Sequence, residues 1–269
     1  MEKIKLYQID AFTDDLFSGN PAAVCPLDDW LPDKVMQSIA LENNLSETAF
    51  FIKKNNKFFI RWFTPTVEMD LCGHATLAAA HVIYTEMNYQ NDKIEFDTKF
   101  VGLLSVTRNK DIFTMNFPGY DPKKVDQKLE DIHEALGVKP KLFLFGQYGL
   151  AIFDNEEEII KMKPDFNKII NLSYNGITVT APGENVDFVS RFFGPKLGIP
   201  EDPVTGGAHC DLTPYWSKRL NKKDMIANQL SNRGGVIYCS YLGDRVCLGG
   251  KATTYMRGEI LLNINKYQL

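Results

Sequence analysis

A short internal repeat constrains the fold of this chain more than any other feature, because it divides the 269 residues into two halves of similar design. Residues 61–65 read Arg-Trp-Phe-Thr-Pro, and residues 191–195 read Arg-Phe-Phe-Gly-Pro, 130 positions later. Each copy precedes an acidic residue and a glycine turn that opens a stretch of small residues, at Asp70–Ala75 and at Asp202–His209. A match this short leaves two readings open, duplication of a domain and coincidence between two strand–turn–helix junctions.

The segments that follow the two junctions predict buried helices. His74–Met87 is apolar or small at nearly every position, and a helix that is apolar on all sides belongs in a protein interior. Gly207–Leu220 has the same place in the second half. We therefore expect an α+β fold of two similar domains, residues 1–120 and 121–269, each with a curved mixed sheet around a central helix. The last strands can also pack on the first half.

Strand patterns outnumber helix patterns along the chain, which favours α+β over a doubly wound sheet. Gly243 and Asp244 indicate a hairpin turn. The predicted strands are Ile4–Phe12, Ala49–Lys53, Phe58–Phe63, Phe113–Phe117, Leu142–Phe153, Ile177–Ala181, Phe188–Phe193, Val236–Tyr241 and Val246–Leu248, and the predicted outer helices are Asp33–Asn43, Gln127–Leu136 and Glu156–Met162.

Composition excludes several classes of function. The formal net charge is −4 and no block of Lys and Arg is present, so we expect no nucleic-acid partner. No apolar run approaches the roughly 20 residues that a membrane span needs, and the N-terminus lacks the pattern of a signal peptide. The five cysteines include no Cys-x-x-Cys pair, which fits reduced thiols in the cytoplasm and predicts no metal site.

The glycine turns at Gly73 and at Gly206–Gly207 each open a predicted helix. The first N–H groups of a helix have no intrahelical partner, and together with the helix dipole they attract an anion. Glycines at such turns also serve close packing alone. Two equivalent turns favour a site for a small anionic molecule between the halves.

Titratable side chains lie beside these turns. Glu47 falls where a predicted helix ends and a strand begins, and it can act as an acid or base if it lies in an apolar pocket; most glutamates in such places are solvated. His74 and His209 follow the two turns, where a neutral histidine can bind a carboxylate or carbonyl. Asp70 and Asp202 can cap the helices or orient the histidines, and for Asp70 we expect a cap.

Cys72 directly precedes Gly73. A position near a helix N-terminus lowers the pKa of a thiol, so Cys72 can be reactive. A buried and inert cysteine fits the sequence equally well.

Three motifs together resemble the phenazine-biosynthesis-F-like (PhzF-like) family. They are Asn-Leu-Ser-Glu-Thr-Ala-Phe at residues 44–50, Asp-Leu-Cys-Gly-His-Ala-Thr-Leu-Ala at 70–78, and Glu-Asp-Pro-Val-Thr-Gly-Gly-Ala-His-Cys at 201–210. The Gly-Asn-Pro-Ala-Ala-Val opening at 19–24 and the Gly-Gly-Lys-Ala turn at 249–252 are also similar. The resemblance runs from about Ile4 to Ile260.

This resemblance implies the diaminopimelate epimerase-like fold, a homodimer, and an isomerase that uses no cofactor and no metal. In the namesake enzyme the glutamate that matches Glu47 shuttles a proton on an amino-hydroxy-cyclohexadiene carboxylate. The residues that match His74 and Asp202 surround that substrate. By the same resemblance, the expected substrate-binding residues are Asn20, Gly73, Ala75, Thr205, Gly206 and Gly207.

The sequence departs from the family pattern at Gly207, where the family commonly has serine. The departure removes one hydroxyl that can contact a substrate, and with it support for the namesake's own substrate. Related epimerases and proline racemase use two opposed cysteines, of which only the first has a counterpart here, Cys72. One-base isomerisation by Glu47 is therefore preferred. The alternatives are a Cys72-dependent epimerase or racemase and a binding protein without catalysis.

Overall fold

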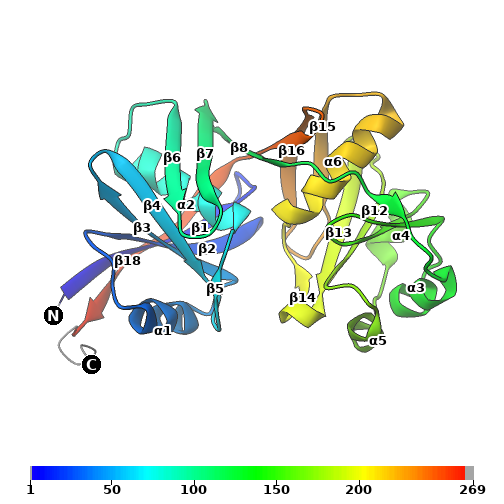
Figure 1. Ribbon diagram of the computed structural model, residues 1–269, viewed down its shortest axis with the longest axis horizontal. Helices are drawn as coiled ribbons and strands as arrows, with labels where there is room; N and C mark the ends of the chain where they lie inside the picture. Colours follow the sequence, from blue (N-terminus) through cyan, green and yellow to red (C-terminus); the bar gives the residue numbers. More distant parts are fainter. Residues whose placement is uncertain (1, 264–269) are drawn as a thin grey trace. The chain divides into compact units, whose positions relative to one another are not determined.

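The computed structural model describes residues 2–263, so Met1 and residues 264–269, at the ends of the two predicted domain ranges, lie outside the described residues. The described residues divide into two compact units (Figure 1). The first unit contains the residues up to Met115 together with those from Gly250 onwards, and the second is Asn116–Gly249. No helix within residues 2–263 has the length and apolarity that crossing a membrane requires.

The first unit is a mixed sheet with one helix buried against it. The helix α2 packs on β1, β2 and β3, and every residue from His74 to Tyr84 in it is buried. β18 pairs antiparallel with β1 along its whole length, which brings the C-terminal segment into this unit. Its elements are β1 (Glu2–Ala11), β2 (Asn20–Leu27), α1 (Asp33–Asn43), β3 (Glu47–Lys54), β4 (Lys57–Phe63), β5 (Glu68–Met69), α2 (Gly73–Glu86), β6 (Lys93–Thr98), β7 (Gly102–Asn109), β8 (Ile112–Pro118, which runs into the second unit) and β18 (Ala252–Leu262).

The second unit has the same plan, with helix α6 packed on β15 and β16. The interior of α6 is buried from Ala208 to Pro214. Its elements are β9 (Lys123–Lys124), α3 (Leu129–Leu136), β10 (Leu142–Phe145), β11 (Gly149–Ile152), α4 (Glu156–Lys161), α5 (Phe166–Asn171), β12 (Ile177–Pro182), β13 (Phe188–Gly194), the 3-10 turn η1 (Pro195–Leu197), β14 (Ile199–Asp202), α6 (Gly206–Leu220), β15 (Asp224–Gln229), β16 (Gly235–Tyr241) and β17 (Arg245–Gly250).

The order of strand pairing is repeated between the units. In the first, β2 and β3 are parallel, β3 and β4 antiparallel, and β4 and β6 parallel. In the second, β11 and β12 are parallel, β12 and β13 antiparallel, and β13 and β15 parallel. The central helix leaves the sheet after β5 in one unit and after β14 in the other. This agreement favours duplication over coincidence for the internal repeat.

The two arginines of the repeat have the same structural role. Arg61 on β4 donates from Nε and Nη2 to the two carboxylate oxygens of Glu68, at 2.6 and 2.8 Å. Arg191 on β13 makes the same pair of bonds to Glu201, at 2.7 and 3.0 Å. Each pair ties a long strand to the short strand that leads to the central helix. A two-bond arginine–carboxylate pair also fixes orientation, so it holds the junction in place.

Outer helices cover each sheet through apolar side chains. In the first unit, Val35, Met36 and Ile39 of α1 belong to a buried cluster with Phe50 and Phe63. In the second unit, α3, α4 and α5 supply a corresponding cluster that contains Ile132, Leu136, Ile159, Ile169 and Phe193.

Most predicted elements agree with the structure to within a few residues, one differs, and several observed elements were not predicted, among them β2, β6, β7, β15 and β18. The predicted single strand Leu142–Phe153 is the hairpin of β10 and β11, because residues 146–148 form a turn in which Gly146 N donates to Tyr148 O. The short helix α5 was not predicted, since its six residues show no clear helical periodicity. The Gly243–Asp244 turn between β16 and β17 is present, with Gly243 at φ 94°.

Candidate active site

Glu47 is the first residue of β3. The helix before it ends at Asn44 in the left-handed region, at φ 50°, and this reversal feeds the chain directly into the strand. Glu47 pairs with Ala22 on the parallel strand β2. Asn20 is two residues from Ala22, so it lies on the same face of the sheet. Both Glu47 and Asn20 are buried. The predicted acid and one predicted binding residue therefore lie on adjacent strands and on the same face of the sheet.

The N-terminus of α2 brings two more predicted residues to Glu47. Cys72 is the N-cap residue of α2 and its side chain makes no capping bond, while His74 is the second helical residue. His74 Nδ1 lies 3.5 Å from Cys72 Sγ, and His74 Nε2 lies 3.2 Å from Glu47 Oε2. The imidazole ring therefore stands between the thiol and the carboxylate.

The contact between Glu47 and His74 is close but not aligned as a hydrogen bond. Glu47 Oε2 and His74 Nε2 are buried and have no hydrogen-bond partner among the described residues, although their separation is that of an ion pair. Both side chains are 91% buried, with 9% of each exposed. The pair thus keeps bonding capacity that a bound molecule can use.

The charges of this group follow from burial and proximity. Burial disfavours the imidazolium form of His74, but the neighbouring Cys72 sulfur and Glu47 carboxylate outweigh burial and raise the pKa of His74 well above its ordinary value. The raised pKa favours the imidazolium form of His74. Burial, reinforced by the Glu47 charge, raises the pKa of the Cys72 thiol. Of the two alternatives for Cys72, the raised pKa favours the buried, inert thiol, because desolvation exceeds the effect of the helix N-terminus.

The same three side chains form a cluster of potential metal ligands. Glu47, Cys72 and His74 each offer one ligand atom, and these atoms lie within 4.8 Å of one another. The sequence predicted no metal site, because its five cysteines include no Cys-x-x-Cys pair. The third member of this cluster, Glu47, lies on β3 and is distant in the chain from Cys72 and His74 at the start of α2, so no local spacing marks the group.

In the second unit, a closed hydrogen-bond network surrounds the N-terminus of α6. The Thr205 hydroxyl donates to Asp202 Oδ2 at 2.6 Å. Gln229 accepts from the Thr205 backbone N–H at 2.9 Å and donates to the Asp202 carbonyl oxygen at 2.8 Å. Asp202 is thus held in place but does not cap α6, whose N-cap is Thr205. Gln229 was not predicted, because nothing in its sequence context marks it.

Two predictions about the junctions are wrong. Asp70 is exposed and does not cap α2, whose N-cap is Cys72. His209 does not face a ligand: it is fully buried, and its Nδ1 lies 2.8 Å from the Thr205 carbonyl oxygen. Burial lowers the pKa of His209 to about 4, so it is neutral at physiological pH. A histidine in the fourth position of a helix turns inward here, whereas one in the second position does not.

Gly206 and Gly207 open α6, as predicted. A side chain at residue 207 would meet Tyr148, because an added Cβ would lie 3.3 Å from both Cε2 and Oη of the ring. Asp211, in the same helix, accepts the backbone N–H groups of Gln147 and Tyr148 at 2.9 to 3.1 Å and so fixes this loop. Burial raises the pKa of Asp211 to about 6 despite these bonds. The role of Asp211 was missed by sequence reasoning.

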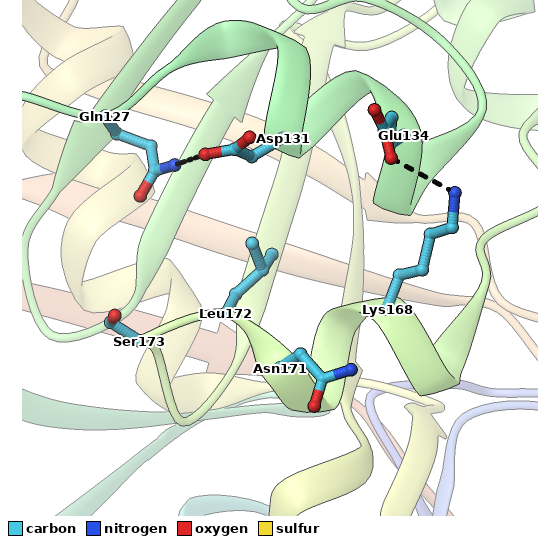
Figure 2. A pocket seen from close by; sticks show the side chains of 7 residues that line it. All are labelled: Gln127, Asp131, Glu134, Lys168, Asn171, Leu172 and Ser173. Atoms are coloured by element: carbon cyan, nitrogen blue, oxygen red, sulfur yellow. Dashed lines mark hydrogen bonds and ion pairs between the residues drawn. The ribbon is translucent and has the colours of Figure 1, made fainter.

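Two surface pockets lie elsewhere. Figure 2 shows one of about 330 Å³ between α3 and α5, where Gln127 contacts Asp131 and Lys168 contacts Glu134. A second, of about 440 Å³, lies beside Phe58 and Tyr89. Neither is lined by a predicted site residue. We assign the active site to neither pocket, because neither is lined by a buried acid or base.

Comparison with known proteins places the chain in a family. The model of the phenazine biosynthesis-like protein family matches residues 9–258. An uncharacterized isomerase of Pseudomonas aeruginosa is 44% identical over 97% of this chain and 100% of its own length. The chain belongs to the phenazine biosynthesis-like family. It is an isomerase by that relationship, as the sequence predicted.

Solved structures agree with this placement. A PhzF-family protein of Enterococcus faecalis is 44% identical, with a TM-score of 0.95 over 97% of this chain and 100% of that chain. A hydroxyproline epimerase of Agrobacterium vitis is 9% identical, with a TM-score of 0.62 over 96% of this chain and 92% of that chain. The second likeness shows the fold alone, and it confirms the predicted epimerase-like architecture.

Proposed function

We propose that this isomerase moves a proton from one carbon to another of a small unsaturated carboxylate, with Glu47 as the acid and base. The observation that carries the proposal is the buried pair of Glu47 and His74, whose facing atoms are 3.2 Å apart and lack hydrogen-bond partners among residues 2–263. A desolvated carboxylate with unused bonding capacity is suited to accept a proton from carbon.

The reaction follows from these positions. Glu47 takes a proton from a carbon next to the conjugated system, and the electron pair of the broken C–H bond moves into that system. The resulting carboxylic acid returns the proton to another carbon. Charged His74 donates a hydrogen bond to the oxygen on which negative charge develops. No electrons are gained or lost overall, so the proposed step needs neither an oxidant nor a reductant.

The carboxylate of the proposed substrate needs hydrogen-bond donors. The N-terminus of α2 offers backbone N–H groups at Gly73 and Ala75, and the helix is 14 residues long, so its dipole favours an anion there. Asn20 lies on the strand beside Glu47. In the second unit, Asp202, Thr205, Gly206 and Gly207 remain proposed contacts of the substrate. Asp202 is already oriented by the Thr205 hydroxyl.

Deuterium incorporation tests the proposal. The protein is incubated in D₂O with a panel of small unsaturated and amino carboxylates, and mass spectrometry detects deuterium on carbon. Wild type and Glu42→Gln are expected to exchange one compound, while Glu47→Gln does not. Glu42 is an exposed glutamate of α1 and serves as the matched control. Equal exchange by folded Glu47→Gln would contradict the role of Glu47.

The same exchange experiment distinguishes Glu47 from Cys72 as the catalytic base. The thiol of Cys72 is 3.5 Å from the same histidine. If Cys72→Ala abolishes exchange and Glu47→Gln retains it, the thiol is the base and the reaction is an epimerisation or racemisation. Full activity in Cys72→Ala excludes that alternative.

Three properties implied by the family resemblance complete the proposal: a homodimer, independence from cofactors, and a cytoplasmic location. Light scattering measures the mass in solution, for which we expect twice the 30.5 kDa of one chain. Turnover by protein that has been dialysed against a chelator and shows no cofactor absorbance would support the second property. Cell fractionation checks the third.

A further inference from the structure

The cluster of Glu47, Cys72 and His74 has a second chemical capacity beyond proton transfer. Each residue is 7% exposed, so the cluster is shielded yet still open to small species. The three ligand atoms lie within 4.8 Å of one another. Glu47 Oε2 and His74 Nε2 are buried without a hydrogen-bond partner in the described part of the chain. Buried polar atoms without a hydrogen bond keep the capacity to bind a further species.

The chemical types of the three side chains determine which metal ions they bind best. A thiolate and an imidazole prefer ions of the zinc type, whereas magnesium and calcium prefer oxygen ligands alone. Zinc bonds are about 2.0 to 2.3 Å long, so neighbouring ligand atoms in a tetrahedral site are roughly 3.3 to 3.8 Å apart. Cys72 Sγ lies 3.5 Å from His74 Nδ1 and Glu47 Oε2 lies 3.2 Å from His74 Nε2, so each neighbouring pair is near this range, although through different ring nitrogens.

The geometry requires one rearrangement. The sulfur lies beside one ring nitrogen and the carboxylate beside the other. A tetrahedral site therefore requires the imidazole or the Glu47 side chain to rotate, so that one ring nitrogen faces the other two ligand atoms. Three protein ligands leave one tetrahedral position for water.

We propose that a divalent ion of the zinc type binds reversibly to Glu47, Cys72 and His74 and thereby inhibits the isomerase. Binding releases one proton from the Cys72 thiol and one from the His74 imidazolium. The resulting site holds a thiolate, a carboxylate, a neutral imidazole and a doubly charged ion, so its net charge is zero. A neutral set of charges is the arrangement that a buried site accommodates at least cost. Inhibition rests on the proposed function of Glu47, whereas binding does not.

Metal binding is measured without substrate. Full-length protein is titrated with Zn²⁺ in equilibrium dialysis, and with Co²⁺ by visible spectroscopy, where a thiolate ligand adds a sulfur-to-cobalt charge-transfer band. We expect one ion per chain and two protons released per ion. Cys72→Ser is expected to weaken binding at least about 100-fold and to abolish the charge-transfer band. Glu47→Gln is expected to weaken binding but to keep the band.

The matched control is Cys247→Ser, which removes a partly exposed thiol of the second unit. It is expected to bind Zn²⁺ as wild type does. Unchanged affinity in Cys72→Ser, or loss in Cys247→Ser instead, would overturn the proposal, as would the absence of saturable binding. Zinc bound at Cys72 without inhibition would retain the metal site but reject Glu47 as the proton-transfer group. Loss of turnover in Glu47→Gln without any zinc binding would reject only the metal site.

Discussion

The two units share one scaffold but differ in the chemistry at the start of the central helix. Both hold their junction with an arginine–glutamate pair, Arg61 with Glu68 and Arg191 with Glu201. At α2, a histidine with a raised pKa lies between a carboxylate and a thiol and keeps unused bonding capacity. At α6, the polar groups of Asp202 and Thr205 bond to one another and to Gln229.

The position of the histidine explains much of this difference. His74 is the second residue of its helix and faces Glu47. His209 is the fourth residue of its helix, and it turns into the interior to meet the Thr205 carbonyl. The strand that corresponds to β3 is β12, which begins with the buried residue Ile177 instead of an acid. A duplicated scaffold can thus hold an acid and base in one copy and a fixed polar network in the other.

The largest expected effect is a difference in lost activity between a variant of the first unit and a variant of the second. Glu47→Gln should lower kcat/KM about 10²- to 10⁴-fold, because it removes the proposed proton-transfer group. Asp202→Asn should lower it only about 10-fold, since an amide oxygen can still accept from the Thr205 hydroxyl. Steady-state kinetics with the compound found by deuterium exchange measures both. An equal or larger loss in Asp202→Asn would assign the proton transfer to the second unit.

The second prediction concerns the stability of the second unit at low pH. The pKa of His209 falls from 6.5 to about 4 on folding, so it contributes stability that is lost as pH falls from 6.5 towards 4. The pKa of Asp211 rises from 3.8 to about 6, so its contribution is present at low pH and is lost as pH rises through 6. The two effects oppose each other in wild type.

A variant that lacks the Asp211 carboxylate leaves the effect of His209 on stability unopposed. Between pH 6.5 and 4, Asp211→Asn should lose about 3 kcal/mol more stability than wild type, because a shift of roughly two pKa units corresponds to that energy. Urea unfolding at several pH values measures the difference. Asp244→Asn, at an exposed aspartate, is the control. Parallel pH profiles for wild type and Asp211→Asn would show that burial does not govern these two groups.

The third prediction tests the common scaffold. Glu68→Gln and Glu201→Gln should each destabilise the protein by about 1.5 to 3 kcal/mol, because each weakens a two-bond pair with a shielded arginine. The arginine side chains are similarly exposed, at 10% and 11%, so the losses should match. Since the bond to Arg61 lowers the pKa of Glu68, its contribution should disappear as pH falls below about 4.5. A large inequality in urea midpoints would contradict the equivalence of the pairs.

The smallest expected effect is at the glycine turn of the second unit. Gly207→Ala places a Cβ 3.3 Å from the Tyr148 ring, so the ring must shift by a few tenths of an ångström. We expect KM to rise a few-fold, with kcat nearly unchanged. Gly206→Ala is the matched variant, since nothing lies within 4 Å of its added Cβ. Equal kinetics for the two variants would remove Gly207 from the substrate site.

Sequence reasoning succeeded where local pattern reflects structure. The uniformly apolar segment after Gly73 predicted a buried helix, and the repeated Arg-x-Phe motif identified equivalent strands. It also singled out Glu47, Cys72 and His74, but it could not show that the imidazole lies between the other two. Their contact depends on the parallel pairing of β2 with β3 and on where α2 begins, which are features of the folded chain.

Other features had no local signal. Gln229 and Asp211 act through neighbours distant in the chain, Thr205 and the Gln147–Tyr148 loop. The sequence left both alternatives for Cys72 open, because it shows the helix terminus but not the burial that opposes it.

One measurement tests the contrast between the units directly. The protein contains four histidines, and NMR titration of their rings, assigned with single His→Gln variants, gives each pKa. We predict that His74 stays protonated well above pH 6.5 and that His209 stays neutral down to about pH 4. In Glu47→Gln the pKa of His74 should fall while that of His209 does not change. A His74 that titrates at or below 6.5, or that ignores the loss of Glu47, would contradict the charged pair on which the proposed chemistry depends.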